Sequence, residues 1–172
     1  MLNIIKQRRS IRKFEEKKIE KEKLESILKG ALMAPSSRGR RPWDLVIVRD
    51  KEKLAQLSQC KVKSASFLTG ADVAIVVVGD PEISDVWIED TSIVATILQL
   101  EAQDQGLGSC WIQVRNRETE DQLSSSEFIK DVLCIPEKYS VECVIAMGYP
   151  AQEKAAHDER QLPKDKIHYD KW

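Results

Sequence analysis

The chain has 172 residues, of which 27 are basic and 28 are acidic, and its formal net charge is −1. This length suffices for one domain whose core needs neither disulfides nor metal. Because opposite charges almost cancel, no overall field attracts nucleic acid or anionic lipid, and we expect any anion site to be local. The N-terminal "MLNIIKQRRS" lacks the apolar core of a signal peptide, and no run approaches the roughly 18 to 20 apolar residues of a membrane helix. We therefore expect a cytoplasmic protein with no membrane partner.

The cysteines and histidines do not follow a metal-binding pattern. No two cysteines have C-x-x-C spacing, and neither His157 nor His168 has a second ligand type at a metal-like distance along the chain. We expect no metal site. Cys110 and Cys143 lie in apolar stretches, where free cysteines behave as small buried hydrophobes.

The first segment with chemical character is "QRRSIRKF", residues 7–14. On a helical backbone Arg8 and Arg12 would point the same way, and Ser10 would add a hydroxyl donor between them. Guanidinium groups match phosphate oxygens in shape. The segment therefore indicates that Arg8, Arg9, Ser10 and Arg12 together hold a terminal phosphate. The alternative is an ordinary solvated basic face.

Apolar residues at near-helical spacing predict an amphipathic helix over 19–33, which Pro35 ends. The loop after it, "APSSRGRRPW" at 34–43, holds three more arginines among serines, prolines and a glycine. Serine hydroxyls and free loop amides can hydrogen-bond a polar heterocycle. The loop is therefore a second candidate for ligand binding, and the alternative is a surface loop with ordinary turn residues.

The middle of the chain alternates predicted strands and helices. Apolar runs rich in branched residues predict interior strands at 45–48 and 71–80, with a short helix between them. Residues 89–105 are apolar around most of the helical circumference, which predicts a helix buried at the domain centre or in an interface. A strand at 109–114, a helix at 118–133 and a strand at 140–150 follow.

After residue 150 the chain becomes polar, and it ends in the alternating hexapeptide "IHYDKW". A frayed terminus is the ordinary interpretation of such a tail. Tyr169 and Trp172 instead favour a segment that reaches another surface, such as a sheet edge on a second subunit. We expect a single domain over 1–172, with 151–172 as a C-terminal arm.

Familiar catalytic motifs are absent from the sequence. "GLGSCW" has Trp111 where a Rossmann fingerprint has its third glycine, and a predicted helix precedes it instead of a strand. No P-loop, zinc-protease or G-x-S-x-G motif occurs. With both histidines in the polar tail, hydrolysis by side chains is disfavoured. If the chain is an enzyme, we expect a bound organic cofactor to carry the reaction and assign no catalytic side chain.

The segments "RRSIRKF", "APSSRGRRPW", "GLGSCWI" and "GYPA" occur in this order and are followed by a late arginine. Together they resemble the nitroreductase family of FMN-dependent NAD(P)H oxidoreductases nearly from end to end. The resemblance implies an α+β fold with a central mixed or antiparallel sheet flanked by helices. It also implies a homodimer that exchanges its C-terminal arms, with FMN at the dimer interface and the apolar helix 89–105 in the interface core.

The resemblance also assigns the cofactor site. It implies that the FMN phosphate and ribityl chain are held by Arg8, Arg9, Ser10 and Arg12, with Arg160 completing the phosphate site. It implies that Pro35, Ser36 and Ser37 approach the flavin from the partner subunit. The isoalloxazine ring would be lined by Trp111, Ile112, Gln113 and Val114.

Several positions depart from the family pattern. Gly39 and Arg41 stand where the family often has asparagine and glutamine, and Gln113 stands at a position that is commonly glycine. Asp158 replaces a lysine that some relatives carry two residues before the late arginine. We therefore expect the phosphate site to depend more heavily on the N-terminal arginines.

The implied reaction is hydride transfer from NADH or NADPH through FMN to a small electron-poor acceptor such as a nitroaromatic, a quinone or a flavin. Arg38, Arg40 and Arg41 are candidates to stabilise the anionic reduced flavin. One alternative is a flavin-binding or storage protein without turnover. Another is a nucleic-acid-binding module using the arginine clusters and Trp43, which the balanced charge and the aromatic content of 6% disfavour.

Overall fold

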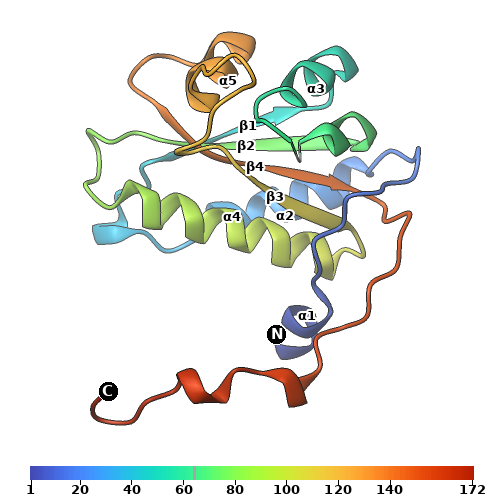
Figure 1. Ribbon diagram of the computed structural model, residues 1–172, viewed down its shortest axis with the longest axis vertical. Helices are drawn as coiled ribbons and strands as arrows, with labels where there is room; N and C mark the ends of the chain where they lie inside the picture. The colour runs from blue at the N-terminus through green and yellow to red at the C-terminus, as the bar shows by residue number, and fades with distance from the viewer. Residues whose placement is uncertain (64) are drawn as a thin grey trace.

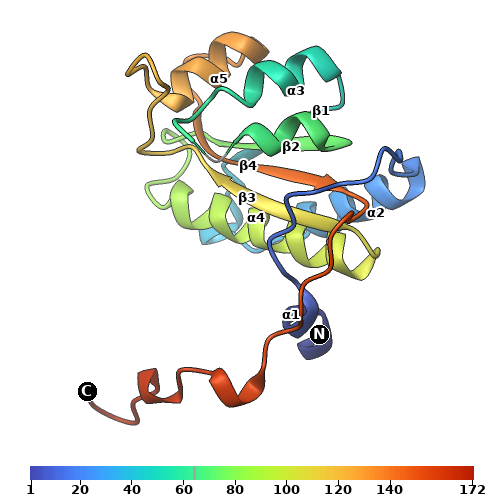
Figure 2. The same ribbon diagram turned by 45° about the vertical axis from the view of Figure 1, so that its right-hand side comes forward.

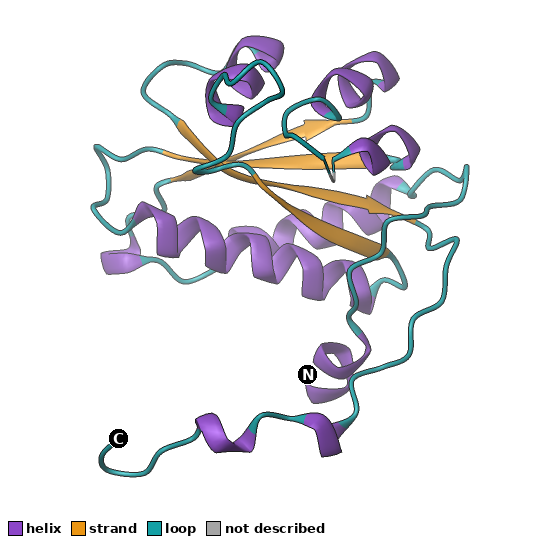
Figure 3. Ribbon diagram, in the orientation of Figure 1, coloured by secondary structure: helices purple, strands orange, loops and turns teal. Residues whose placement is uncertain are grey.

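The computed structural model describes residues 1–63 and 65–172. The chain forms a four-stranded sheet with helices on both of its faces (Figure 1, Figure 3). The strands are β1 (Trp43–Val48), β2 (Val73–Gly79), β3 (Gly108–Gln113) and β4 (Ser140–Gly148). The helices are α1 (Leu2–Gln7), α2 (Lys21–Leu32), α3 (Lys51–Leu57), α4 (Trp87–Asp104) and α5 (Ser125–Leu133).

The sheet has the strand order β1-β2-β4-β3, and each neighbouring pair is antiparallel. This confirms the expected α+β architecture. β2 is buried over its whole length, as its continuous apolar sequence predicted. β1 was expected to be interior as well, but it is an edge strand. Its residues are apolar because helices cover both faces of the sheet. The apolar pattern of a single strand does not show whether other strands pair with it on both sides.

Two apolar clusters lie on opposite faces of the sheet. One cluster joins α2 and α4 to the sheet through residues such as Ile27, Leu98 and Ile145. The other joins α3 and α5 to the opposite face through residues such as Leu54 and Ile129. Because side chains alternate along a strand, β2 and β4 contribute to both clusters. α4 faces the sheet with one side, whereas Ile93 on its outer side is 38% exposed.

The helix predicted at 118–133 begins later, at Ser125. The preceding residues form a turn, in which Thr119 donates its backbone N–H to the carbonyl of Leu123. Gln122 has a φ of 61° within this turn, in the left-handed region that interrupts a right-handed helix. The polar stretch 118–124, with Leu123 as its single apolar residue, therefore turns before the helix begins at Ser125.

Both ends of the chain leave the body of the fold together (Figure 1, Figure 2). The backbone N–H of His157 donates to the carbonyl of Lys6, which ties the C-terminal segment to α1. Beyond it the chain makes only short 3₁₀ turns, and 167–172 forms no strand within the chain. Tyr169 is 82% exposed and Trp172 is 98% exposed. Among the described residues, no helix is long and apolar enough to cross a membrane.

Candidate cofactor site

The segment that carries the N-terminal arginines is extended, not helical. α1 ends before Arg8, and Ser10 forms an isolated parallel bridge with Ser109 at the start of β3. Ile11 donates its backbone N–H to the carbonyl of Ser109 at 2.9 Å. The helical geometry assumed for Arg8 and Arg12 is therefore wrong. The physical reason is that β3 offers the segment backbone partners that no local sequence pattern can reveal.

The buried side chain of Ile11 fixes the orientation of this segment. Ile11 packs over Gly108, where an added Cβ would lie 2.8 Å from Ile11 Cγ2. Because neighbouring side chains in an extended segment point to opposite sides, Ser10 and Arg12 project away from this contact.

Positive charge gathers around the buried thiol of Cys110 on β3. Burial raises the pKa of Cys110, while the charges of Arg12, Lys154 and Arg8 and a hydrogen bond with Ser10 oppose that rise. Ser10 forms a bridge with Ser109, and its carbonyl accepts from Lys154 Nζ, which places both residues at the start of β3. Arg8 and Arg12 lie two residues on either side of Ser10. We call Arg8, Ser10, Arg12 and Lys154 the cationic cluster.

Lys154 is a member that the sequence interpretation missed. Its Nζ donates to the backbone carbonyl of Ser10 at 2.7 Å. A lysine in a polar tail carries no sequence signal for such a contact, because 144 residues separate the partners along the chain.

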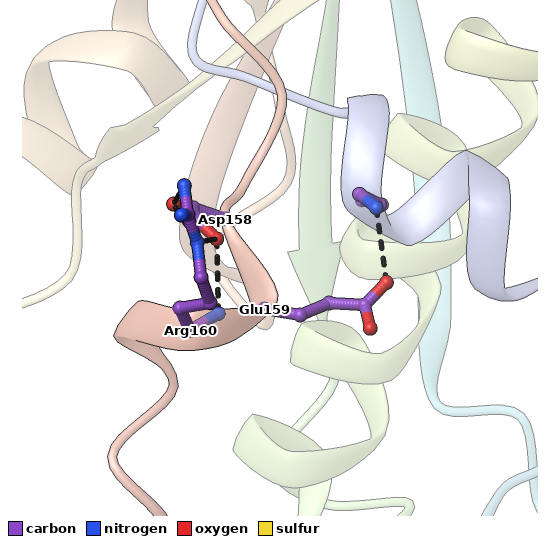
Figure 4. Close-up of polar contacts among 4 residues, drawn as sticks. Asp158, Glu159 and Arg160 are labelled. Carbon is purple, nitrogen blue, oxygen red and sulfur yellow. Dashed lines mark hydrogen bonds and ion pairs between the residues drawn. The ribbon is translucent and has the colours of Figure 1, made fainter.

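Arg9 and Arg160 lie outside the contacts that define the cluster. Arg9 donates to the carbonyl of Ala155 and so fastens the C-terminal segment. Arg160 pairs with Asp158, and the neighbouring Glu159 pairs with Lys6 of α1 (Figure 4). Their assignment to the phosphate therefore stays a prediction.

The loop between α2 and β1 is held against the first turn of α4 and the connection that precedes it. The backbone N–H of Ser37 donates to Asp90 Oδ1 at 2.8 Å, and the Arg40 guanidinium donates to the carbonyl of Ile83 at 3.0 Å. Within the loop, Arg41 donates its backbone N–H to Ser36 Oγ at 3.0 Å. These bonds fix the backbone around the two predicted serines.

The same loop contains backbone conformations that favour glycine. Gly39 has a φ of 67°, and Arg38 and Arg41 have φ values of 53° and 48°. Non-glycine residues rarely occupy this region.

Pro35 lies exposed at the beginning of the loop. The sequence interpretation missed Asp90, which is 3% exposed and holds the loop through Ser37.

The end of β3 presents two polar side chains. Trp111 donates its indole N–H to Gln113 Oε1 at 2.9 Å, and Gln113 Nε2 donates to the carbonyl of Arg115 at 3.1 Å. Ile112 and Val114 are buried in the cluster beneath α3 and α5. Of the four predicted flavin-lining residues, Trp111 and Gln113 are therefore the two whose side chains are partly exposed.

The predicted site residues occupy separate places within one chain. The cationic cluster lies at the start of β3, close to the C-terminal end of α4, whereas the loop with Ser37 is bonded to the first turn of α4. α4 has 18 residues, so its two ends are separated by about 27 Å. Trp111 and Gln113 lie farther along β3 than the cationic cluster.

Comparisons with known proteins agree with this architecture. The Nitroreductase family model matches residues 5–63 and 54–149. A solved structure of an FMN-dependent nitroreductase from Clostridium difficile R20291 is 50% identical, covers 100% of both chains and superposes with a TM-score of 0.97.

Two archaeal relatives carry the provisional name NADH dehydrogenase/NAD(P)H nitroreductase. The protein from Archaeoglobus fulgidus is 37% identical, with 99% of this chain and 98% of the relative covered. The protein from Methanothermobacter thermautotrophicus is 34% identical, with 100% of this chain and 87% of the relative covered. The chain therefore belongs to the nitroreductase family.

Proposed function

We propose that this chain is an FMN-dependent oxidoreductase, which takes a hydride from NADH or NADPH and passes electrons to a small electron-poor acceptor. The observation that carries the proposal is the cationic cluster, which the Ser10–Ser109 bridge and the Lys154 hydrogen bond hold at the start of β3, in a chain half identical to an FMN-dependent nitroreductase. FMN supplies the redox chemistry when it is bound. Nitroaromatics, quinones and free flavin are the acceptors that we propose.

The charge state of the cluster suits a phosphate. Within residues 1–63 and 65–172, no carboxylate forms an ion pair with Arg8 or Arg12. Their guanidinium groups are thus free to bind an anion in a planar, bidentate manner. We propose that Arg8, Ser10, Arg12 and Lys154 hold the phosphate, and that the flavin extends along β3 toward Trp111 and Gln113.

A second subunit would complete the site. The loop around Ser36 and Ser37 is about one length of α4 away from the cationic cluster in the same chain, roughly 27 Å. The outer side of α4 exposes Ile93, and the C-terminal segment exposes Tyr169 and Trp172. We therefore propose a homodimer in which the partner's loop reaches the flavin and the segment 151–172 packs on the partner.

The test is to purify the chain, record its visible spectrum and measure FMN binding with and without Arg12→Ala. We expect about one FMN per subunit and much weaker binding in the variant. Arg117→Ala is the control, because the guanidinium of this exposed arginine donates to the carbonyl of its neighbour Asn116 and not to a member of the cationic cluster. A colourless chain that does not bind added FMN would refute the proposed function.

A further inference from the structure

The Arg12 guanidinium lies over the ring of Phe67, with its carbon Cζ 5.8 Å from the ring centroid. A cationic group within about 6 Å of an aromatic centroid is attracted by the negative face of the ring. The two residues belong to segments that are distant along the chain, so only the folded chain brings them together. The contact therefore joins a member of the cationic cluster to the body of the fold.

The direction of the Arg12 side chain follows from the extended course of its segment. Arg12 and Phe14 lie two positions apart, so their side chains point to the same side. Phe14 forms a bridge with Pro150 and packs against the apolar cluster beneath α3 and α5. Phe67 packs against the same cluster. Arg12 is therefore directed toward the side of the sheet on which Phe67 lies.

Phe67 is carried by a short 3₁₀ helix, Ser66–Gly70, that is anchored in the core. Its neighbour Leu68 is buried. The backbone N–H of Leu68 donates to the carbonyl of Ala65 at 3.0 Å, and its carbonyl accepts from the N–H of Ala71 at 3.1 Å. Phe67 itself is only partly buried. Its ring is therefore a fixed surface that is still accessible to a long, flexible side chain.

An aromatic ring holds a guanidinium differently from a carboxylate. The ring attracts the positive charge but does not take up the N–H donors, which stay available for an anion. Arg160, by contrast, gives its N–H groups to Asp158. Over residues 1–63 and 65–172, Arg12 has no carboxylate partner. The contact with Phe67 thus positions Arg12 and leaves its hydrogen-bonding capacity for a ligand.

We infer that Phe67 is a positioning residue, whose ring holds the Arg12 guanidinium in place to bind the anionic part of FMN. An arginine side chain loses conformational freedom when it binds a ligand, and a side chain that is already held loses less. The inference rests on the proposed function, because it names a residue that supports the cationic cluster assigned to FMN. Its own content is the coupling between Phe67 and Arg12.

The contact is tested first in the full chain without cofactor. The current in an aromatic ring shifts the NMR signals of nearby protons, so the Nε–H signal of Arg12 in a ¹⁵N spectrum reports on Phe67. Arg12→Lys assigns this signal by removing it. We expect Phe67→Leu to move the signal toward the position of a solvated arginine. Phe67→Tyr keeps the ring and should preserve it.

FMN titration then measures the consequence for binding. Phe67→Leu should weaken FMN binding by about two- to fivefold, the range expected for a cation–π contact at an exposed site, and Phe67→Tyr should retain the affinity. In an Arg12→Ala background, Phe67→Leu should have almost no further effect, because the side chain that the ring positions is gone. This non-additivity separates positioning from a general loss of packing.

Phe128→Leu is the matched control for the loss of an aromatic ring. Phe128 is partly buried against the same apolar cluster, and within the described part of the chain no cationic side chain lies over its ring. It should leave the Arg12 signal and the FMN affinity unchanged. If Phe67→Leu does not fold, Phe67→Met, which removes the ring with a smaller loss of volume, takes its place with the same expectations.

The inference is overturned if the Arg12 signal is the same in Phe67→Leu as in the unmodified chain. It is also overturned if Phe67→Leu weakens FMN binding equally with and without Arg12→Ala, because Phe67 would then act only through packing. Failure of the unmodified chain to bind FMN refutes the proposed function. The NMR measurement needs no cofactor, so it decides the contact between Phe67 and Arg12 separately.

Discussion

The guanidinium group of Arg160 is bound on two sides by the carboxylate of Asp158. Arg160 Nε lies 3.0 Å from Asp158 Oδ1, and the terminal Nη2 lies 2.8 Å from Oδ2. The hydrogen bonds from Arg160 lower the pKa of Asp158, so this carboxylate is charged at neutral pH. A phosphate that used Arg160 would have to compete with a neighbour two residues away.

We predict that Arg160→Ala weakens FMN binding by less than about fivefold, because exposed ion pairs contribute little. Arg12→Ala should weaken FMN binding much more. Asp158→Asn should tighten binding modestly, since it frees Arg160 for the anion. Fluorescence titration of FMN measures all three affinities. An Arg160→Ala defect as large as that of Arg12→Ala would show that Asp158 does not occupy the guanidinium in the complex.

Gly108 permits the close approach of the N-terminal segment to β3. In Gly108→Ala the new methyl group would lie 2.8 Å from Ile11 Cγ2, so we expect a loss of stability of about 1 to 3 kcal/mol together with weaker FMN binding. Chemical denaturation and FMN titration measure the two effects. The double variant Ile11→Ala with Gly108→Ala should recover part of the binding, and Gly70→Ala, which meets no neighbour, should be neutral. Full FMN affinity in Gly108→Ala would contradict the coupling of this contact to the cationic cluster.

Asp90 supports the loop before β1 from the first turn of α4. Asp90→Ala leaves the N–H of Ser37 without its acceptor, which should cost about 1 to 3 kcal/mol of unfolding free energy and weaken FMN binding from the loop side. Asp90→Asn retains an acceptor oxygen and should cost less. Urea denaturation compares these variants with the control Asp85→Ala, which changes an exposed residue in the connection before α4. Equal losses in the two Asp90 variants would argue against the Ser37 hydrogen bond as the cause.

Local patterns predicted those parts of the fold that depend on local sequence. The strands β2 and β4 and the helix α4 follow from apolar runs and helical spacing, and they lie close to the predicted ranges. The extended course of 8–12 could not be predicted in this way, because it depends on the bridge between Ser10 and Ser109. The edge position of β1 is likewise a property of the whole sheet.

The candidate site was predictable only in part for the same reason. The arginines near the N-terminus were visible as a cluster, whereas Lys154 and Asp90 join their partners through contacts between distant segments. Outside the candidate site, the buried Glu142 at the register shift of β4 is a charged residue inside the apolar run "SVECVIAMG". A bulge can accommodate such a residue in a buried strand, because it re-aims the side chain.

Asp80 contributes to the pH dependence of stability and also binds the end of the loop before β1. Its carboxylate accepts from Lys138 Nζ at 2.9 Å and from the backbone N–H of Glu82, while its own N–H binds the carbonyl of Pro42. The hydrogen bond from Lys138 is the largest of the effects that lower the pKa of Asp80 in the folded chain. The stabilisation from this carboxylate is therefore fully present above the ordinary value of 3.8 and is lost as the pH falls through the lowered folded value.

We predict that the stability advantage of the unmodified chain over Asp80→Asn is constant from neutral pH down to about 5 and then declines in acid. Lys138→Gln should shrink this decline, because the folded pKa of Asp80 then returns toward its ordinary value and less stabilisation remains to be lost in acid. Denaturant melts at a series of pH values measure both curves, with Lys29→Gln on α2 as a control for general charge effects. An advantage that grows as the pH falls would contradict the sign derived from the Lys138 contact and would assign the acid response to another group.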